Sequence, residues 1–309
     1  MLYVTALQEG FLYGLLALGV FISLRILNIP DLTTEGSFGF GNAVAAATAV
    51  LGYPRLSLLF ALLAGVCAGL ITGVLQTKLK VHPVLAGIIT MSGLYSVNLM
   101  VRGGPNLAVG QNALFKMIQV LLPESASRDE KKILGTLLAA AVCIAVVVLV
   151  ALFFKTHFGL CIRATGDNPD MVRASSINVD LTRIMGLCIA NGLIALSGAL
   201  IAHYVGYSDA SSQNATLIYG LAAVIIGEAI FSLFGKGRRG VTVGLISAVC
   251  GSIIYKLIVT FVVDVELFGK NSANLMKLLC AVIVAVTLVI PAARDGIAAW
   301  KTRWEARRA

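Results

Sequence analysis

Charged side chains are scarce in this sequence: Asp, Glu, Lys and Arg together make up 13% of its 309 residues. Soluble domains carry about 25% charged residues. The amino acids Ala, Val, Ile, Leu, Met, Phe, Trp, Tyr and Cys account for 58%. The chain therefore has no room for a sizeable water-soluble domain, and chemistry that takes place in water must come from partner chains.

Motifs for catalysis are also missing. The sequence has three histidines and no HExxH pattern. A phosphate-binding loop of the GxxxxGK[ST] type is absent, since the nearest run, Phe234-Gly-Lys-Gly, lacks the first glycine and the hydroxyl residue. The six cysteines are scattered without a CxxC pair, so we expect no metal site, no disulfide framework and no cofactor. Any ATP must be bound and hydrolysed by a separate subunit.

Long apolar runs fill most of the chain. A bilayer span needs about 20 mostly apolar residues, which leaves room for roughly nine spans. The candidate runs lie at about 6–27, 38–52, 56–76, 84–101, 133–154, 184–207, 217–234, 241–263 and 275–293. We predict an all-α polytopic membrane protein of about 8–10 transmembrane helices, with residues 1–309 forming one domain.

Basic residues cluster between the apolar runs. Cytoplasmic loops of membrane proteins are enriched in Lys and Arg. The loops that this rule assigns to the cytoplasm are 77–83, 155–183 and 235–240, with the C-terminal tail; those assigned to the outside are 102–132, 208–216 and 264–274. The net charge of +9 thus reflects membrane orientation and contact with lipid, and we expect no nucleic-acid partner.

The cytoplasmic loop at 155–183 carries helix-capping residues. Asn168 is a good N-cap, Pro169 suits the first helical position, and Asp170 lies at the positive end of the helix dipole. These residues predict a short helix over about 169–176 that lies flat at the cytoplasmic surface. An ordinary loop is the alternative, because capping alone does not exclude it.

The residues that follow are predicted to end this helix and to start the next one. Asn178 tolerates the left-handed conformation and is expected to close the short helix, and Asp180 is expected to cap the next membrane helix. Met171, Val172 and Ser175 are predicted to be exposed, where they would fill an apolar groove on a partner.

Three motifs in this order resemble one family of transporters. They are Pro30-Asp-Leu-Thr-Thr-Glu-Gly-Ser-Phe38, then Phe158-Gly-Leu-Cys-Ile-Arg-Ala-Thr-Gly-Asp-Asn-Pro169, and then Leu217-Ile-Tyr-Gly-Leu-Ala-Ala-Val-Ile-Ile-Gly227. The middle motif resembles the coupling-helix signature of ABC importer permeases of the ribose and branched-chain amino acid permease family. The chain departs from the sugar-permease pattern at Gly227-Glu-Ala-Ile-Phe231, and Ser176 replaces the usual glycine. It is more similar to the branch assigned to tryptophan and other aromatic amino acids.

The resemblance implies a function and a set of partners. The chain would be the permease subunit of a type II-like ABC importer in the bacterial cytoplasmic (inner) membrane, working as a homodimer or as half of a pair. An extracytoplasmic binding protein or lipoprotein would deliver a small solute, best assigned as an amino acid. ATPase subunits would dock on a coupling helix at about 164–178. The residues implied in coupling are Gly166, Asp167, Asn168, Pro169, Met171, Val172, Arg173 and Ser175.

Ionisable residues at membrane depth are costly and usually face a cavity or a partner. One interpretation therefore places a polar set along the translocation path: Asp31, Thr33, Thr34, Glu35, Ser37 and Glu228. The alternative has Asp31 and Glu35 capping the second helix at the cytoplasmic interface, with Arg25 as ion-pair partner. For Glu228 the alternative is a structural pair with Arg238 or Arg239.

Small residues at four-residue spacing indicate close helix contacts. Gly65, Gly69 and Gly73 lie on one helix face, and Gly240 and Gly244 repeat the spacing. In lipid such faces let helix backbones approach and gain dispersion contacts. The spacing does not say whether the contact lies within one subunit or across a dimer.

Two other functions compete with the ABC permease. A secondary transporter driven by an ion gradient would suit a broken helix with Asp31 and Glu228, but it gives no reason for a capped cytoplasmic helix. A membrane enzyme would need a polar cluster near one interface, and the sequence offers mainly the 28–37 region.

Overall fold

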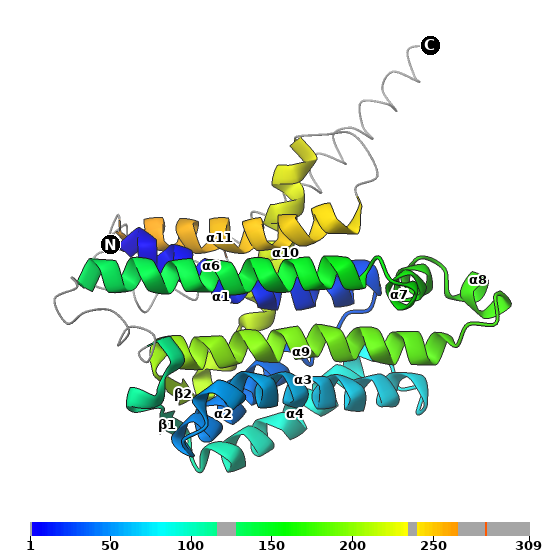
Figure 1. Ribbon diagram of the computed structural model, residues 1–309. Helices are drawn as coiled ribbons and strands as arrows, with labels where there is room; N and C mark the ends of the chain where they lie inside the picture. The colour runs from blue at the N-terminus through cyan, green and yellow to red at the C-terminus, as the bar shows by residue number, and fades with distance from the viewer. Residues whose placement is uncertain (1, 116–127, 234–239, 265–281, 283–309) are drawn as a thin grey trace.

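The computed structural model describes residues 2–115, 128–233, 240–264 and 282, and they form a helical bundle (Figure 1). Seven of the described segments are long and apolar enough to cross a membrane. They are Leu2–Ile26, Pro54–Thr77, Pro83–Arg102, Asp129–Phe153, Val179–Val205, Ala210–Ser232 and Val241–Val262. The predicted all-α polytopic class is confirmed. The apolar run predicted at 275–293 lies outside the described residues.

The first membrane segment ends in a helix break. Helix α1 (Leu2–Phe21) continues into a π-helical turn, η1 (Ile22–Ile26), and helix α2 (Thr34–Val50) begins only after a non-helical stretch. The start of α2 thus falls in the polar region 28–37, between the apolar runs at 6–27 and 38–52. At 17 residues α2 is shorter than a full span.

Two full-length helices complete the first half. Helices α3 (Pro54–Thr77) and α4 (Pro83–Arg102) both have proline in the first turn, where its missing N–H costs no helical hydrogen bond. The chain then forms strand β1 (Asn106–Ala108) and the short 3-10 turn η2 (Gly110–Asn112). Strand β1 pairs antiparallel with β2 (Tyr207–Asp209), with Asn106 opposite Asp209.

The second half contains six described α-helices and another short turn. Their bounds are α6 (Arg128–Phe153), α7 (His157–Asp167), α8 (Pro169–Ala174), α9 (Val179–Val205), the 3-10 turn η3 (Ala210–Gln213), α10 (Thr216–Leu233) and α11 (Val241–Asp264). Figure 1 shows α8 at the opposite end of the bundle from the two strands. We call the strand end the outer end and the α8 end the cytoplasmic end, as the basic loops assign them.

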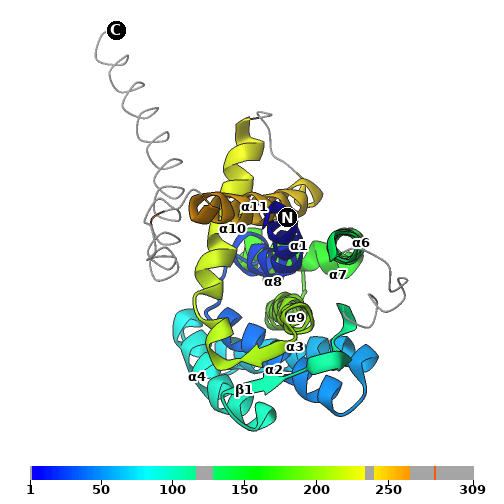
Figure 2. The ribbon, with the colours of Figure 1, turned by 90° about the vertical axis from the view of Figure 1, so that its left-hand side faces the viewer.

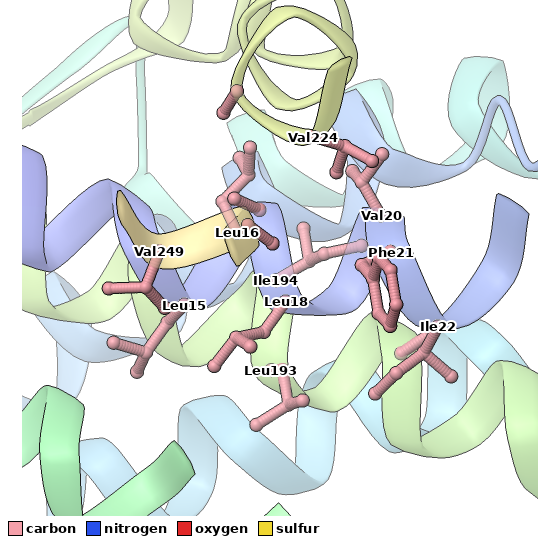
Figure 3. Close-up of a cluster of buried hydrophobic side chains, with 14 of the residues drawn as sticks. Leu15, Leu16, Leu18, Val20, Phe21, Ile22, Leu193, Ile194, Val224 and Val249 are labelled. Atoms are coloured by element: carbon pink, nitrogen blue, oxygen red, sulfur yellow. The ribbon is translucent and has the colours of Figure 1, made fainter. Parts of the chain in front are cut away.

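Helix α9 occupies the centre of the bundle. It packs against α1, α2 and α3, and Figure 2 shows it between a group formed by α2, α3 and α4 and another that contains α1, α10 and α11. The apolar core fills the space between α1, α9, α10 and α11, where Leu16, Ile194, Val224 and Val249 meet (Figure 3). The dense helix contacts of this core hold the bundle together in lipid.

The glycine face of α3 packs against α9 within the same subunit. A Cβ atom at Gly65 would lie 2.4 Å from the backbone oxygen of Asn191, and one at Gly69 would lie 2.4 Å from that of Leu187. At Gly73 the distance to the Ile184 Cα atom would be 3.0 Å. The predicted packing role of this glycine triple is therefore confirmed, and its contact lies within the subunit.

The second glycine pair is only half explained. A Cβ atom at Gly244 would lie 2.3 Å from Cζ of Phe21, whereas one at Gly240 would meet no atom of the described residues within 4 Å. Close approach therefore accounts for Gly244 and not for Gly240.

Candidate functional site

A buried carboxylate lies at the helix break. Asp31 accepts a hydrogen bond from the backbone N–H of Thr33 at 2.9 Å through Oδ1, and another from the Asn191 amide at 2.8 Å through Oδ2. Asn191 in turn accepts a hydrogen bond from the Ser37 hydroxyl at 2.6 Å. Because Asn191 lies midway along the 27-residue α9, Asp31 is at the middle of the bundle. The alternative that places Asp31 at the cytoplasmic interface beside Arg25 is therefore wrong.

The threonines of the break hold its backbone in place. The Thr33 hydroxyl lies 2.9 Å from that of Thr72 on α3, and the Thr34 hydroxyl donates to the Asp31 carbonyl oxygen at 3.1 Å. Asp31, Thr33, Thr34 and Ser37 are all buried. They form one polar layer between α2, α3 and α9, and their place on the translocation path stays a prediction.

Glu35 points to a different neighbour. It lies in the first turn of α2, and its carboxylate lies near the backbone N–H groups of Ala215 and Leu217, which favour its charged form. These amides belong to the start of α10, where the helix dipole favours a negative charge. Asp31 precedes α2 whereas Glu35 lies within it. Asp31 and Glu35 therefore do not share a helix face, and they contact different neighbours.

The predicted cytoplasmic helix is present as α8. The Asn168 side chain accepts hydrogen bonds from the backbone N–H groups of Asp170 and Met171, both at 3.1 Å, and Pro169 occupies the first helical position. The N-cap prediction is confirmed. Helix α8 ends at Ala174, two residues before the predicted end, because Ser176 adopts the left-handed conformation with φ +60°.

Two expectations about the end of α8 are wrong. Asn178 does not close α8; its side chain accepts hydrogen bonds from the N–H groups of Asp180 at 3.0 Å and Leu181 at 3.1 Å, so it is the N-cap of α9. Asp180 consequently lies in the first turn of α9 and does not cap it. Asn and Asp are both good N-caps, and the residue closer to the preceding turn occupies the position.

The exposed surface of α8 differs from the prediction at one residue. Met171 is 57% exposed and Ser175 is also exposed, as expected, but Val172 is only 1% exposed. Helix α8 contacts α7 and α9, so Val172 serves to seat it on the bundle and cannot enter a partner groove. Asp167 and Arg173 are exposed beside Met171.

Gly166 contacts the first membrane segment. A Cβ atom there would lie 1.8 Å from the backbone oxygen of Ile26 in η1, so α7 and the π-helical turn are in direct contact. A displacement of α8 and α7 would therefore reach the helix break that follows η1.

Comparisons with known proteins identify the family. Residues 2–290 match the family described as "Branched-chain amino acid transport system / permease component". The chain belongs to this family of ABC importer permeases. This permease is accordingly a multi-pass protein of the bacterial inner membrane that serves the import of a small solute.

Individual relatives agree with this assignment. The permease is 32% identical over 286 residues to the "Tyrosine transport system permease protein" of Clostridioides difficile, covering 92% of this chain and 90% of that protein. It is 36% identical to an uncharacterized protein of Rickettsia prowazekii, covering 74% and 77%. It is 28% identical to the "Autoinducer 2 import system permease protein LsrC" of Yersinia enterocolitica, covering 77% and 61%.

A solved structure shares the fold. It is "PsaBC from Streptococcus pneumoniae in complex with Fab", with a TM-score of 0.51 and 14% sequence identity, covering 91% of this permease and 89% of that chain. At this identity the likeness supports the architecture alone.

An ion pair that the sequence did not predict joins α10 to the π-helical turn. The Arg25 guanidinium contacts the Glu228 carboxylate, and both side chains are about one third exposed or more. Arg238 and Arg239, the predicted partners of Glu228, lie outside the described residues. The pair borders a cleft of about 750 Å³ at the cytoplasmic end, together with Arg163 and Asp167 of α7.

We expect a charge swap to reveal how much this pair contributes. Exposed ion pairs contribute about 0–1 kcal/mol, so Glu228→Gln should lower the unfolding free energy of the permease by no more than that. Glu228→Arg places two cations side by side and should destabilise more, and adding Arg25→Glu should restore the loss. Thermal unfolding in lipid nanodiscs measures all three variants. A double swap no more stable than Glu228→Arg alone would show that the two residues do not interact.

Proposed function

We propose that this permease imports an aromatic amino acid, with separate ATPase subunits docked on α8 and an extracytoplasmic binding protein or lipoprotein delivering the substrate. Two copies of the chain would form the channel. The aromatic substrate is supported by 32% identity to a tyrosine transport permease over nearly the whole chain. The family match supports an ATP-driven importer over an ion-gradient-driven one. No cofactor is assigned to the permease itself, and ATP is bound by the partner subunit.

The observation that carries the proposal is the capped helix at the cytoplasmic end. Force from an ATPase must pass through a surface that is stiff and accessible. Asn168 fixes the first turn of α8 by two hydrogen bonds, and the exposed Met171 lies on that turn. Val172 anchors α8 to the bundle, and Gly166 brings α7 against η1. This chain of contacts leads from the docking surface to the helix break.

Disrupting α8 should uncouple ATP hydrolysis from transport. Asn168→Ala removes an N-cap, which typically costs about 0.5–2 kcal/mol, and Met171→Asp places a charge on the docking surface. We expect the double variant to insert normally but to lose ATPase association and amino-acid uptake. The measurements are pull-down of the ATPase and tyrosine uptake into membrane vesicles at equal expression.

The matched control is Leu51→Asp. Leu51 is 73% exposed at the C-terminal end of α2, which lies at the outer end of the bundle. Like Met171→Asp, this substitution places a negative charge at an exposed apolar residue, but far from α8. It should retain ATPase association. If the α8 double variant keeps both association and uptake, α8 is not the coupling element.

A further inference from the structure

Helix α4 carries two buried polar side chains, one turn apart, with unused hydrogen-bonding atoms. Asn98 is 0% exposed and Arg102 is 4% exposed. The Asn98 amide nitrogen donates to the Gly36 carbonyl oxygen at 3.3 Å and to Gln213 at 3.1 Å, but its Oδ1 atom has no partner among the described residues. Arg102 donates from Nε to the Ser208 hydroxyl at 2.7 Å and from Nη2 to the Gly39 carbonyl oxygen at 3.2 Å. Its Nη1 atom has no hydrogen-bond acceptor among the residues that the structure describes.

The charge of Arg102 is not neutralised by contact. An arginine guanidinium stays protonated in proteins, and both of its hydrogen-bond acceptors here are uncharged. Asp209 interacts with it only at longer range, because no salt bridge within 4.0 Å joins the two among the described residues. The Ser211 side chain hydrogen-bonds to Asp209 and lowers the pKa of that carboxyl below its usual value. A buried charge without a counter-charge in contact is unfavourable, and the unused Nη1 atom is a donor that an anion could bind.

The two unused atoms complement each other. Residues four apart lie on the same face of a helix, one turn of about 5.4 Å from one another. Asn98 Oδ1 is an acceptor and Arg102 Nη1 is a donor. An α-amino acid carries its ammonium group and its carboxylate on the same α-carbon; the ammonium group needs an acceptor and the carboxylate needs a donor.

The facing helix is shaped for this contact. Both side chains bind carbonyl oxygens of α2, at Gly36 and Gly39. A Cβ atom at Gly39 would lie 2.8 Å from the Asn98 amide nitrogen and 1.7 Å from Gln213, so any larger residue would displace both. The same turns of α2 carry Glu35 and Ser37, which were predicted to line the path.

We propose that Asn98 and Arg102 bind the α-ammonium and α-carboxylate groups of the transported amino acid at the outer end of the permease. The inference rests on the proposed function, since it names the groups of that substrate that are recognised. In the present conformation Ser208 of β2 and Gln213 of η3 cover the two side chains. Substrate entry therefore requires the short segment from β2 to η3 to move away from α4.

The test compares three probes on the permease co-purified with its ATPase in lipid nanodiscs. They are L-tyrosine, tyramine, which lacks the carboxylate, and 3-(4-hydroxyphenyl)propionate, which lacks the ammonium. Titration calorimetry should show wild type binding L-tyrosine roughly tenfold to hundredfold more tightly than either analogue, as expected for the loss of one hydrogen bond to a charged group. Arg102→Gln should abolish the preference over tyramine and keep the preference over the propionate. Asn98→Leu should do the reverse.

A purely structural role would not produce these opposite losses. Arg102→Lys keeps the charge and should retain part of the preference over tyramine, which also covers the case in which Arg102→Gln fails to fold. Arg55→Gln removes an exposed charge from the first turn of α3 at the same end and should leave all three affinities unchanged. If Arg102→Gln or Arg102→Lys discriminates between the probes as wild type does, the site is wrong.

A measurement of uptake distinguishes failure of the proposed binding site from failure of the proposed function. Vesicles that import tyrosine through a permease with no preference between tyrosine and tyramine would overturn the site and leave the function standing. Vesicles that import no amino acid would overturn both.

Discussion

Replacing Gly65 by alanine is expected to destabilise the permease strongly, although the change adds a single methyl group. That methyl carbon would lie 2.4 Å from the Asn191 backbone oxygen and 2.5 Å from the Ala195 Cβ atom. Contacts this short with a helix backbone are relieved only if α3 and α9 move apart. Overpacking of this kind typically costs about 1–3 kcal/mol. Thermal unfolding in lipid nanodiscs should show the loss.

Helix α9 meets another close contact, from α2. A Cβ atom at Gly41 of α2 would lie 2.0 Å from the Ala195 backbone oxygen, so Gly41→Ala should be at least as harmful. The matched control is Gly93→Ala, because a Cβ atom there would meet nothing within 4 Å in the part of the chain that the structure describes. Alanine favours a helix over glycine by up to about 1 kcal/mol, so this control should be neutral or stabilising. Equal stability of Gly65→Ala and Gly93→Ala would contradict the packing assignment.

These glycines show how far a local pattern can be interpreted. The four-residue spacing of Gly65, Gly69 and Gly73 predicts a face of close contact, because spacing alone places small residues on one side of a helix. It carries no information about the facing helix. That α9 of the same subunit is the partner follows only from the fold.

The helix caps were also predictable in part, because a cap depends on residues that are close together in the sequence. The Asn168 side chain bonds to the backbone N–H groups of Asp170 and Met171, two and three residues further on, so the local sequence contains everything needed. Between Asn178 and Asp180 the sequence offered two good caps two residues apart, and the left-handed Ser176 decided in favour of Asn178. Val172 was assigned to the wrong side because a helix of six residues has too few turns to define an apolar face.

Contacts between distant residues could not be predicted from one sequence. Arg25 and Glu228 are separated by 203 residues, and Asp31 and Asn191 by 160. The polar stretch at 28–37 is visible in the sequence as a gap between two apolar runs, but its depth in the membrane is fixed by Asn191 at the middle of α9. The unused atoms of Asn98 and Arg102 are likewise invisible until the partners of every neighbouring group are known.

We expect substitution of Asp31 to have the largest effect on transport. Asp31→Ala removes the acceptor of two buried hydrogen bonds, from the Thr33 backbone and from Asn191. Hydrogen bonds to a charged group contribute about 1.5–3 kcal/mol each, so the polar layer around α2 should lose several kcal/mol. Thermal unfolding and tyrosine uptake at equal expression measure the two consequences. Asp129→Ala, an exposed acid in the first turn of α6, is the control and should change neither.

Exchanging the two partners separates a structural role from a role in the path. In the double variant Asp31→Asn with Asn191→Asp, the amide at position 31 donates to a carboxylate at position 191, and the Ser37 hydroxyl still finds an acceptor there. Stability should therefore recover in part, because a carboxylate at position 191 can no longer donate to the Leu187 carbonyl oxygen as Asn191 does, whereas the negative charge has moved from the helix break to α9. If uptake recovers together with stability, Asp31 acts only by holding α2 in place. If stability recovers and uptake does not, transport requires the carboxylate at the start of α2, as a position on the translocation path demands. Wild-type stability of Asp31→Ala itself would show that these hydrogen bonds do not hold the break together.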